Sequence, residues 1–304
     1  MRNKLQVVQH IILFTLVLAT GLSNAGASDD MLASVMQVGV RHASGRLAIG
    51  SAVIIAPGIL VTACHGTRDA VSVVLMHRGE QLPVNVQSED IRHDLCILSA
   101  PSIRGPVALF DDHRRLSVGD EVIAAGFSKG YRLQASVGQV KALYNYDGAQ
   151  VIRVSAPFST GASGGGLFDR QGRLIGILSF KSTAGDDHHY AMPVDWLSQT
   201  NAPQAAADPE SNESFWERAE QLQPYFLRGA WLEGKQDWGG LVSLAEQWTH
   251  AEPANVEAWI SLARANGKLG RLNPAQEALR RAALLDPKHV EVQLLQSANN
   301  IVTN

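Results

Sequence analysis

Cysteine, net charge and long apolar runs are all scarce in this sequence of 304 residues. Two cysteines are too few for a cysteine-rich zinc site. A formal net charge of −3 provides no basic field, which excludes nucleic acid as an expected partner. The apolar run from Ile11 to Ala19 is too short to span a bilayer. The remaining composition, 45% hydrophobic and 18% charged residues, indicates a soluble globular protein long enough for two domains.

The first 27 residues are typical of a secretory signal peptide. Arg2 and Lys4 precede the apolar run, and the small residues at 23–27 allow cleavage after Ala25 or Ala27. An uncleaved N-terminal anchor is the alternative. We therefore expect an exported protein, periplasmic or extracellular, without stable membrane insertion after cleavage. Export also permits a disulfide between Cys64 and Cys96, although two free buried thiols fit the sequence equally well.

Residues 33–199 have the pattern of an all-β domain. Asp147-Gly148, between two apolar segments, predicts a tight hairpin. Many short strands at close spacing indicate a sandwich or barrel. The strand-like segments are 47–55, 59–62, 71–76, 94–98, 121–125, 151–154 and 174–180.

The pattern changes near Thr200. Residues 200–212 suit a linker, and residues 213–304 have helical spacing. Pro253 and Pro287 lie 34 residues apart, the period of a helix–turn–helix repeat. Residues 256–288 resemble the tetratricopeptide repeat at Trp259, Leu262, Gly270, Ala275, Leu279, Ala282 and Pro287. A plain helical bundle is the alternative, because the preceding unit matches the repeat more loosely.

Three segments carry residues suited to acyl transfer. His65 ends the apolar segment 60–65, Asp94 opens the apolar segment 94–98, and Ser163 lies in the glycine-rich run 159–168. A serine hydroxyl is a weak nucleophile that needs an imidazole to accept its proton, and a carboxylate to fix the tautomer of that imidazole. Glycines beside the serine allow backbone N–H groups to surround a developing oxyanion.

The order of these residues separates two hydrolase folds. Residues 161–165 formally match G-x-S-x-G, but an α/β-hydrolase elbow requires a following helix and a downstream acid and histidine. A further strand pattern follows Ser163 instead, and His65 and Asp94 precede it. The sequence therefore favours the chymotrypsin order.

Residues of about 36–196 resemble the trypsin-like peptidase domain, particularly its HtrA (Deg) branch. The resemblance rests on five segments, Gly50–Ile54, His93–Leu98, Gly161–Gly165, Leu174–Ile177 and Tyr190–Pro193. It implies two six-stranded β-barrels and a serine endopeptidase that needs no cofactor. The PDZ domain common in this branch has no counterpart, because the helical segment stands in its place.

The resemblance also implies a role for each matching residue. His65 would be the general base and acid, Asp94 the orienting carboxylate and Ser163 the nucleophile, with the N–H groups of Gly161 and Ser163 as the oxyanion hole. Ser179, Phe180 and Lys181 would pair with extended substrate. Phe158, Ser179 and Tyr190 would approach the primary specificity pocket.

The sequence departs from the family pattern at two positions, and it differs from trypsin itself at a third. Pro157 stands where trypsin has the aspartate that selects basic residues, which predicts an apolar or small residue before the scissile bond. Ala162 replaces the usual asparagine before the nucleophile, and Gly166 replaces the usual proline after the double glycine. Either change could shift the resting conformation of the oxyanion loop.

We therefore expect an exported serine endopeptidase that acts on polypeptides, with neither a metal site nor a cofactor. The segment Asp186–His189 is better explained as a solvated loop than as a metal site. The helical region could bind a protein partner or only dock onto the peptidase domain. A non-catalytic binding scaffold is the main alternative, and an esterase-like or self-processing activity is a third.

Overall fold

The structure is a computed structural model that describes residues 24–77, 79–110, 116–130, 132–182, 188–198 and 213–302. The predicted linker and most of the predicted signal peptide lie outside these residues. The described chain begins with helix α1 (Asn24–Ala33), and it contains no helix with the length and apolar character needed to cross a membrane.

The first barrel closes from six antiparallel strands in the order β1-β2-β3-β6-β5-β4. A four-residue helix, α2 (Cys64–Thr67), follows β3. The strands are β1 (Val35–His42), β2 (Leu47–Ala56), β3 (Ile59–Thr62), β4 (Ala70–His77), β5 (Glu80–Asp90) and β6 (Leu95–Ser99).

The second barrel closes in the order β10-β11-β12-β9-β8-β7. Short 3-10 turns lie at η1 (Ser128–Gly130), η2 (Val194–Ser198) and η3 (Glu220–Leu222). The strands are β7 (Glu121–Gly126), β8 (Gln134–Tyr146), β9 (Ala149–Val154), β10 (Gly166–Asp169), β11 (Leu174–Lys181) and β12 (His189–Pro193). The predicted pair of barrels is thus confirmed.

The hairpin predicted at Asp147-Gly148 is also present and joins β8 to β9. Both turn residues have positive φ, 44° and 79°, as a tight two-residue hairpin turn requires. Strands β1, β5, β8, β10 and β12 were not among the predicted segments. Strand β5 alternates between half-buried and exposed positions and contains a proline, whereas β10 has only four residues, so neither shows a clear apolar run.

Within the described residues, five α-helices follow the barrels, and consecutive helices contact one another. Ala275, Leu279 and Ala282 are buried, as their helical spacing in the sequence predicts. The helices are α3 (Tyr225–Gly234), α4 (Trp238–Ala251), α5 (Val256–Lys268), α6 (Leu272–Leu285) and α7 (Val290–Val302).

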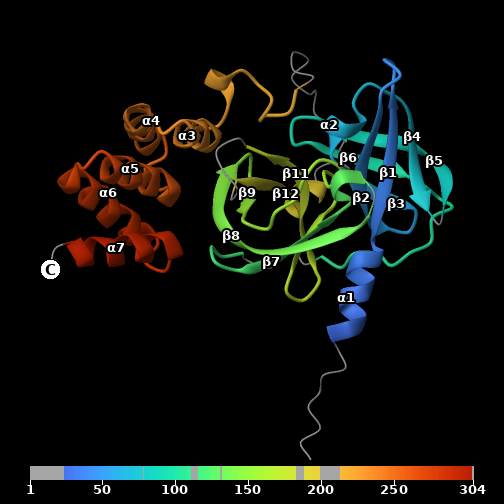
Figure 1. Cartoon of the computed structure of the whole chain (residues 1–304), viewed down its shortest axis with the longest axis horizontal. Coiled ribbons are helices and arrows are strands. Elements are labelled where there is room, and N and C mark those ends of the chain that lie inside the picture. The colour runs from blue at the N-terminus through green and yellow to red at the C-terminus, as the bar shows by residue number, and fades with distance from the viewer. Residues whose placement is uncertain are drawn as a thin grey trace, which may run out of the picture.

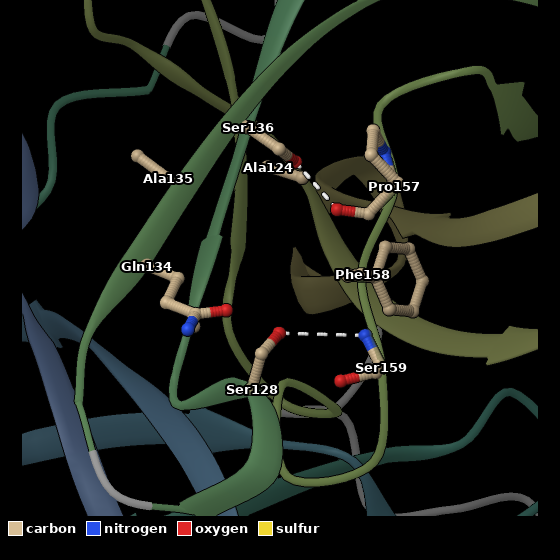
Figure 2. Close-up of a pocket in the computed structure, with 9 residues that line it drawn as sticks. Ala124, Ser128, Gln134, Ala135, Ser136, Pro157, Phe158 and Ser159 are labelled. Atoms are coloured by element: carbon tan, nitrogen blue, oxygen red, sulfur yellow. Dashed lines mark hydrogen bonds between the residues drawn. The ribbon is translucent and has the colours of Figure 1, made fainter.

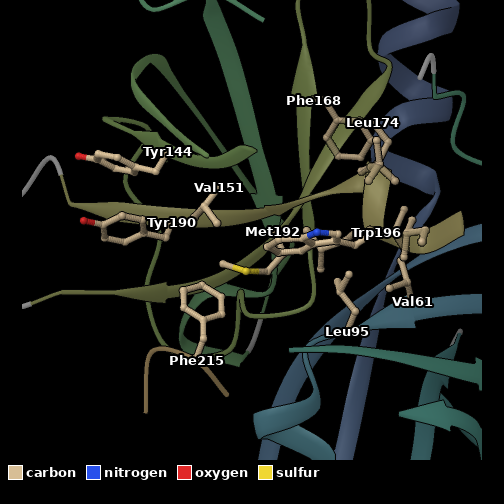
Figure 3. Packing of buried hydrophobic residues seen from close by; sticks show 14 of the residues in the cluster. Val61, Leu95, Tyr144, Val151, Phe168, Leu174, Tyr190, Met192, Trp196 and Phe215 are labelled. Atoms are coloured by element: carbon tan, nitrogen blue, oxygen red, sulfur yellow. The ribbon is translucent and has the colours of Figure 1, made fainter. Parts of the chain in front are cut away.

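The helical region packs beside the second barrel, on the side away from the first (Figure 1). The ring of Phe226 in α3 stacks on Tyr144 of β8, with centroids 4.3 Å apart and an interplanar angle of 7°. A continuous buried cluster joins the helices to both barrels, and Figure 3 shows Val61 and Leu95 of the first barrel approaching Trp196, with Tyr144, Tyr190 and Phe215 in the same cluster. The helical region is therefore docked on the barrels.

Candidate active site

His65, Asp94 and Ser163 come from three different elements. His65 lies in α2, Asp94 ends the turn before β6, and Ser163 lies in the loop before β10 of the other barrel. The Nδ1 atom of His65 lies 2.8 Å from Oδ2 of Asp94, and the backbone N–H of His65 donates to Oδ1 at 2.8 Å. Two bonds from one carboxylate therefore hold both the ring and the backbone of the histidine.

The carboxylate of Asp94 is completely buried. The hydroxyl of Ser179, on β11 of the second barrel, donates a short hydrogen bond to Oδ2 of Asp94. The backbone of Asp94 has φ 60°, a left-handed conformation that aspartate tolerates better than most residues. Ser179 thus ties the carboxylate of one barrel to a strand of the other, a contact that the sequence did not indicate.

The pKa of His65 is raised above its ordinary value. Burial lowers this pKa, but the charge of Asp94 and its hydrogen bond to the ring raise it, and the charge of Glu217 raises it further. Arg68 opposes the effect weakly. The imidazolium form of His65 is therefore stabilised by two carboxylates.

The hydroxyl of Ser163 donates to the backbone oxygen of Ser179 at 2.8 Å. Within the described chain, Nε2 of His65 has no hydrogen-bond partner, so the serine and the histidine are not bonded to each other. Ser163 is partly exposed, whereas Ser179 is buried. Ser179 therefore contacts two of the three predicted residues, through its carbonyl and through its hydroxyl.

The loop that carries Ser163 is hydrogen-bonded to the first barrel. The hydroxyl of Ser51 donates to the carbonyl of Gly161 at 2.7 Å, and the N–H of Ser51 donates to the carbonyl of Ser163 at 2.9 Å. Gly161 has φ +96°, and a Cβ atom there would lie 2.4 Å from the carbonyl oxygen of Phe127, so only glycine fits. The N–H groups of Gly161 and Ser163 donate to no atom of the described residues. Two free donors therefore lie beside the serine hydroxyl.

The two departures from the family pattern have local explanations. Ala162 is fully buried, and its N–H donates to the carbonyl of Ser159 at 2.9 Å. Gly166 begins β10, where a Cβ atom would lie 2.3 Å from the ring of Phe168. A proline at Gly166 would meet this ring, so the glycine is compatible with the packing of this barrel.

Cys64 and Cys96 form a disulfide, with Cα atoms 4.9 Å apart. This finding decides between the two states that the sequence left open. Both cysteines are buried, and the bond joins the residue before His65 to the residue two places after Asp94. It therefore links the two segments that carry the histidine and the carboxylate.

The residues predicted to bind substrate differ in exposure. Phe158 and Tyr190 are buried, Phe180 is partly buried and Lys181 is exposed. Phe180 stacks on Tyr190 with centroids 4.7 Å apart. Tyr190 thus lies beneath Phe180.

Two pockets lie near these residues. A pocket of about 240 Å³ is lined by His65, Gly161 and Ser163. A larger pocket of about 500 Å³ lies between residues 157–159 and the start of β8 (Figure 2). It includes none of the three predicted catalytic residues.

A segment of the C-terminal region also reaches this site. The ring of Trp216 meets His65 edge to face, with centroids 5.4 Å apart, and stacks on Phe180 at 4.6 Å. Glu217 forms a two-point ion pair with Arg68, with both nitrogen–oxygen distances 2.8 Å. The sequence did not place these residues at the site, because contacts between residues about 150 positions apart leave no local pattern.

The described residues contain no group of three or more histidine, cysteine or acidic side chains placed to hold a metal ion. Asp186 and Asp187 lie outside the described residues. The expectation of a solvated loop is wrong for His189, which is buried in β12 with Nε2 3.1 Å from the carbonyl oxygen of Phe158.

Comparison with known proteins finds similarity to serine proteases. Residues 50–177 match the model of the trypsin-like peptidase domain. A DegP-like periplasmic serine endoprotease of Chlamydia pneumoniae is 30% identical over 135 residues, which cover 42% of this chain and 28% of that protein. The serine protease Do-like HtrA of Lactobacillus helveticus is 32% identical over 141 residues, which cover 43% of this chain and 34% of that protein. The chain thus spans about a third or less of the length of these relatives.

Solved structures agree with the sequence matches. An HtrA-type protease determined with a tripeptide superimposes with a TM-score of 0.52 at 26% identity, covering 59% of this chain and 62% of that one. The active form of a protease from M. tuberculosis has a TM-score of 0.55 at 18% identity, covering 70% of this chain and 99% of that one. The second likeness is one of fold alone.

Proposed function

We propose that the trypsin-like peptidase domain of this chain, which is HtrA/DegP-like in sequence, is an active serine endopeptidase that works through an acyl-enzyme on Ser163. The observation that carries the proposal is the pairing of His65 with buried Asp94 next to two free N–H groups at Ser163. A buried carboxylate at Nδ1 and free donors beside the nucleophile are what peptide-bond hydrolysis requires.

The roles follow from these contacts. Because Nδ1–H of His65 donates to Asp94, Nε2 is the atom left to accept a proton. The Ser163 hydroxyl would turn from the carbonyl of Ser179 to Nε2, and catalytic hydrogen bonds often tighten in this way only when substrate binds. Its oxygen then attacks the peptide carbonyl while His65 takes the proton.

The tetrahedral oxyanion would accept hydrogen bonds from the N–H groups of Gly161 and Ser163. On its collapse the C–N bond breaks, and His65 gives the proton to the leaving amine. Water then attacks the acyl-enzyme by the same proton route, which releases the carboxylate product and restores Ser163. None of these reaction steps requires an oxidant or a reductant.

The substrate is a polypeptide that pairs with Ser179, Phe180 and Lys181 at the edge of β11. Residues 155–162 contain no acid, which supports an apolar or small residue before the scissile bond. The predicted signal peptide and the periplasmic relatives support export. The 34-residue period and the paired helices support tetratricopeptide-like repeats.

One observation favours the alternative of a non-catalytic scaffold: the Ser163 hydroxyl is bonded to Ser179 rather than to His65. Labelling of the purified protein with a fluorophosphonate probe separates the two functions. We expect Ser163 to be labelled in the wild type, and labelling to be lost in Ser163→Ala and His65→Ala. Absence of labelling in folded wild-type protein would support the scaffold.

A further inference from the structure

The segment at residues 213–218, here the Trp216 segment, is fixed to the first barrel on both sides of Trp216. The N–H of Phe215 donates to the carbonyl of Arg92 at 3.1 Å, and Glu217 is paired to Arg68 at 2.8 Å. An Oε atom of Glu217 also accepts from the N–H of Ser214 at 3.0 Å, which closes the turn. The segment therefore has a defined position across the site.

Trp216, between these two anchors, is half-buried. It contacts the ring of His65 and the ring of Phe180, which lies on the strand proposed to pair with substrate. Its indole N–H has no acceptor among the described residues. Its side chain is held by aromatic contacts, so a substitution at Trp216 changes the shape of the site without breaking a side-chain hydrogen bond.

An extended peptide presents successive side chains to opposite faces. We place such a peptide with its reacting carbonyl at Ser163 and its backbone along Phe180. The side chain of the residue before the scissile bond then points to one face. The side chain of the second residue before the scissile bond points to the opposite face, where the rings of His65 and Phe180 form the sides of the space. Trp216 already occupies the space between these two rings.

We propose that Trp216 is a specificity-determining residue, which fills the subsite for the second residue before the scissile bond. The protease would therefore select peptides with glycine or alanine at that position. This inference rests on the proposed peptidase function, and it assigns to the C-terminal region a part in substrate choice. Larger side chains would meet the indole.

The test uses activity-based probes of two kinds on the full chain. Peptidyl phosphonates that differ only in alanine or leucine at the second position report the subsite, and a fluorophosphonate without a peptide reports the activated serine. We expect wild-type protein to be inactivated at least ~10-fold faster by the alanine probe, since apolar pockets discriminate side chains by ~10–200-fold. We expect Trp216→Ala to lose this preference and Trp216→Phe to show an intermediate ratio.

Trp231→Ala is the matched control, because Trp231 lies on α3, is 37% exposed and contacts Lys235. It should keep the wild-type ratio. Three outcomes would overturn the subsite inference alone. The first is equal rates for both peptidyl probes in the wild type, and the second is an equal change for both in Trp216→Ala. The third is no reaction of either peptidyl probe with a protein that the fluorophosphonate labels. No labelling by the fluorophosphonate would overturn the proposed peptidase function, and the inference with it.

Discussion

Two carboxylates and one guanidinium act on the pKa of His65, and they belong to different parts of the chain. Asp94 is the direct partner of His65, whereas Glu217 and Arg68 act on it as a more distant ion pair. The sequence predicted His65, Asp94 and Ser163 as site residues from local motifs, because each lies in a short segment of recognisable pattern. It could not identify Ser179 as a partner of Asp94, since that contact joins residues 85 positions apart.

The charges around His65 predict a shift in pH dependence. The proposed mechanism needs neutral His65, so kcat/KM should fall as the pH drops through the raised pKa of this residue. Glu217→Gln removes a charge that favours the imidazolium, so the pKa falls and the acidic limb moves to lower pH. Arg68→Gln removes a charge that opposes it, so the limb moves to higher pH.

Profiles of kcat/KM against pH for the wild type and both variants would measure these shifts. The two substitutions break the same ion pair, so a purely structural effect would move both limbs in one direction. Such a common direction would contradict the electrostatic account.

At the scale of elements, the disulfide joins the start of α2 to β6. Its cysteines are 32 positions apart in the sequence, and β4 and β5 lie between them. Apolar runs were sufficient to predict most of the strands. They could not predict β5, whose half-exposed face lacks such a run, nor the pairing of the cysteines, which depends on the closure of the barrel.

We expect Cys64→Ala with Cys96→Ala to lower the free energy of unfolding by about 3–4 kcal/mol, because the unfolded chain gains the entropy of an open loop of this length. Urea unfolding followed by circular dichroism would measure the loss. The single variant Cys64→Ala should lose about as much, since either change removes the bond. An unchanged midpoint in the double variant would contradict this expectation.

At the scale of the whole molecule, the sequence predicted two domains and a linker. The structure joins them through one buried cluster that includes Val61, Tyr144, Phe226 and Trp248. Composition showed where the strands end and the helices begin, but contacts between the two halves have no periodicity within either half. Docking could therefore be stated from the sequence only as one of two possibilities.

This shared core predicts that barrels and helices unfold together. Phe226 is 4% exposed and stacks on Tyr144. Phe226→Ala should therefore lower the free energy of unfolding by about 3–5 kcal/mol, and it should lower the temperature of a single transition of the whole chain. Leu284→Ala, at a position 78% exposed on α6, is the control and should change little. Two separate calorimetric transitions, with only one shifted by Phe226→Ala, would show that the halves are independent.

The position of Trp216 also bears on how such proteins diverge. The groups proposed to cleave the peptide lie in the two barrels, whereas the ring that narrows the cleft belongs to neither barrel. A mutation at Trp216 can therefore change which substrates are preferred without changing the groups proposed to catalyse the reaction. Proteins that descend from a common ancestor can thus keep the same reaction and acquire different substrates through changes in the Trp216 segment.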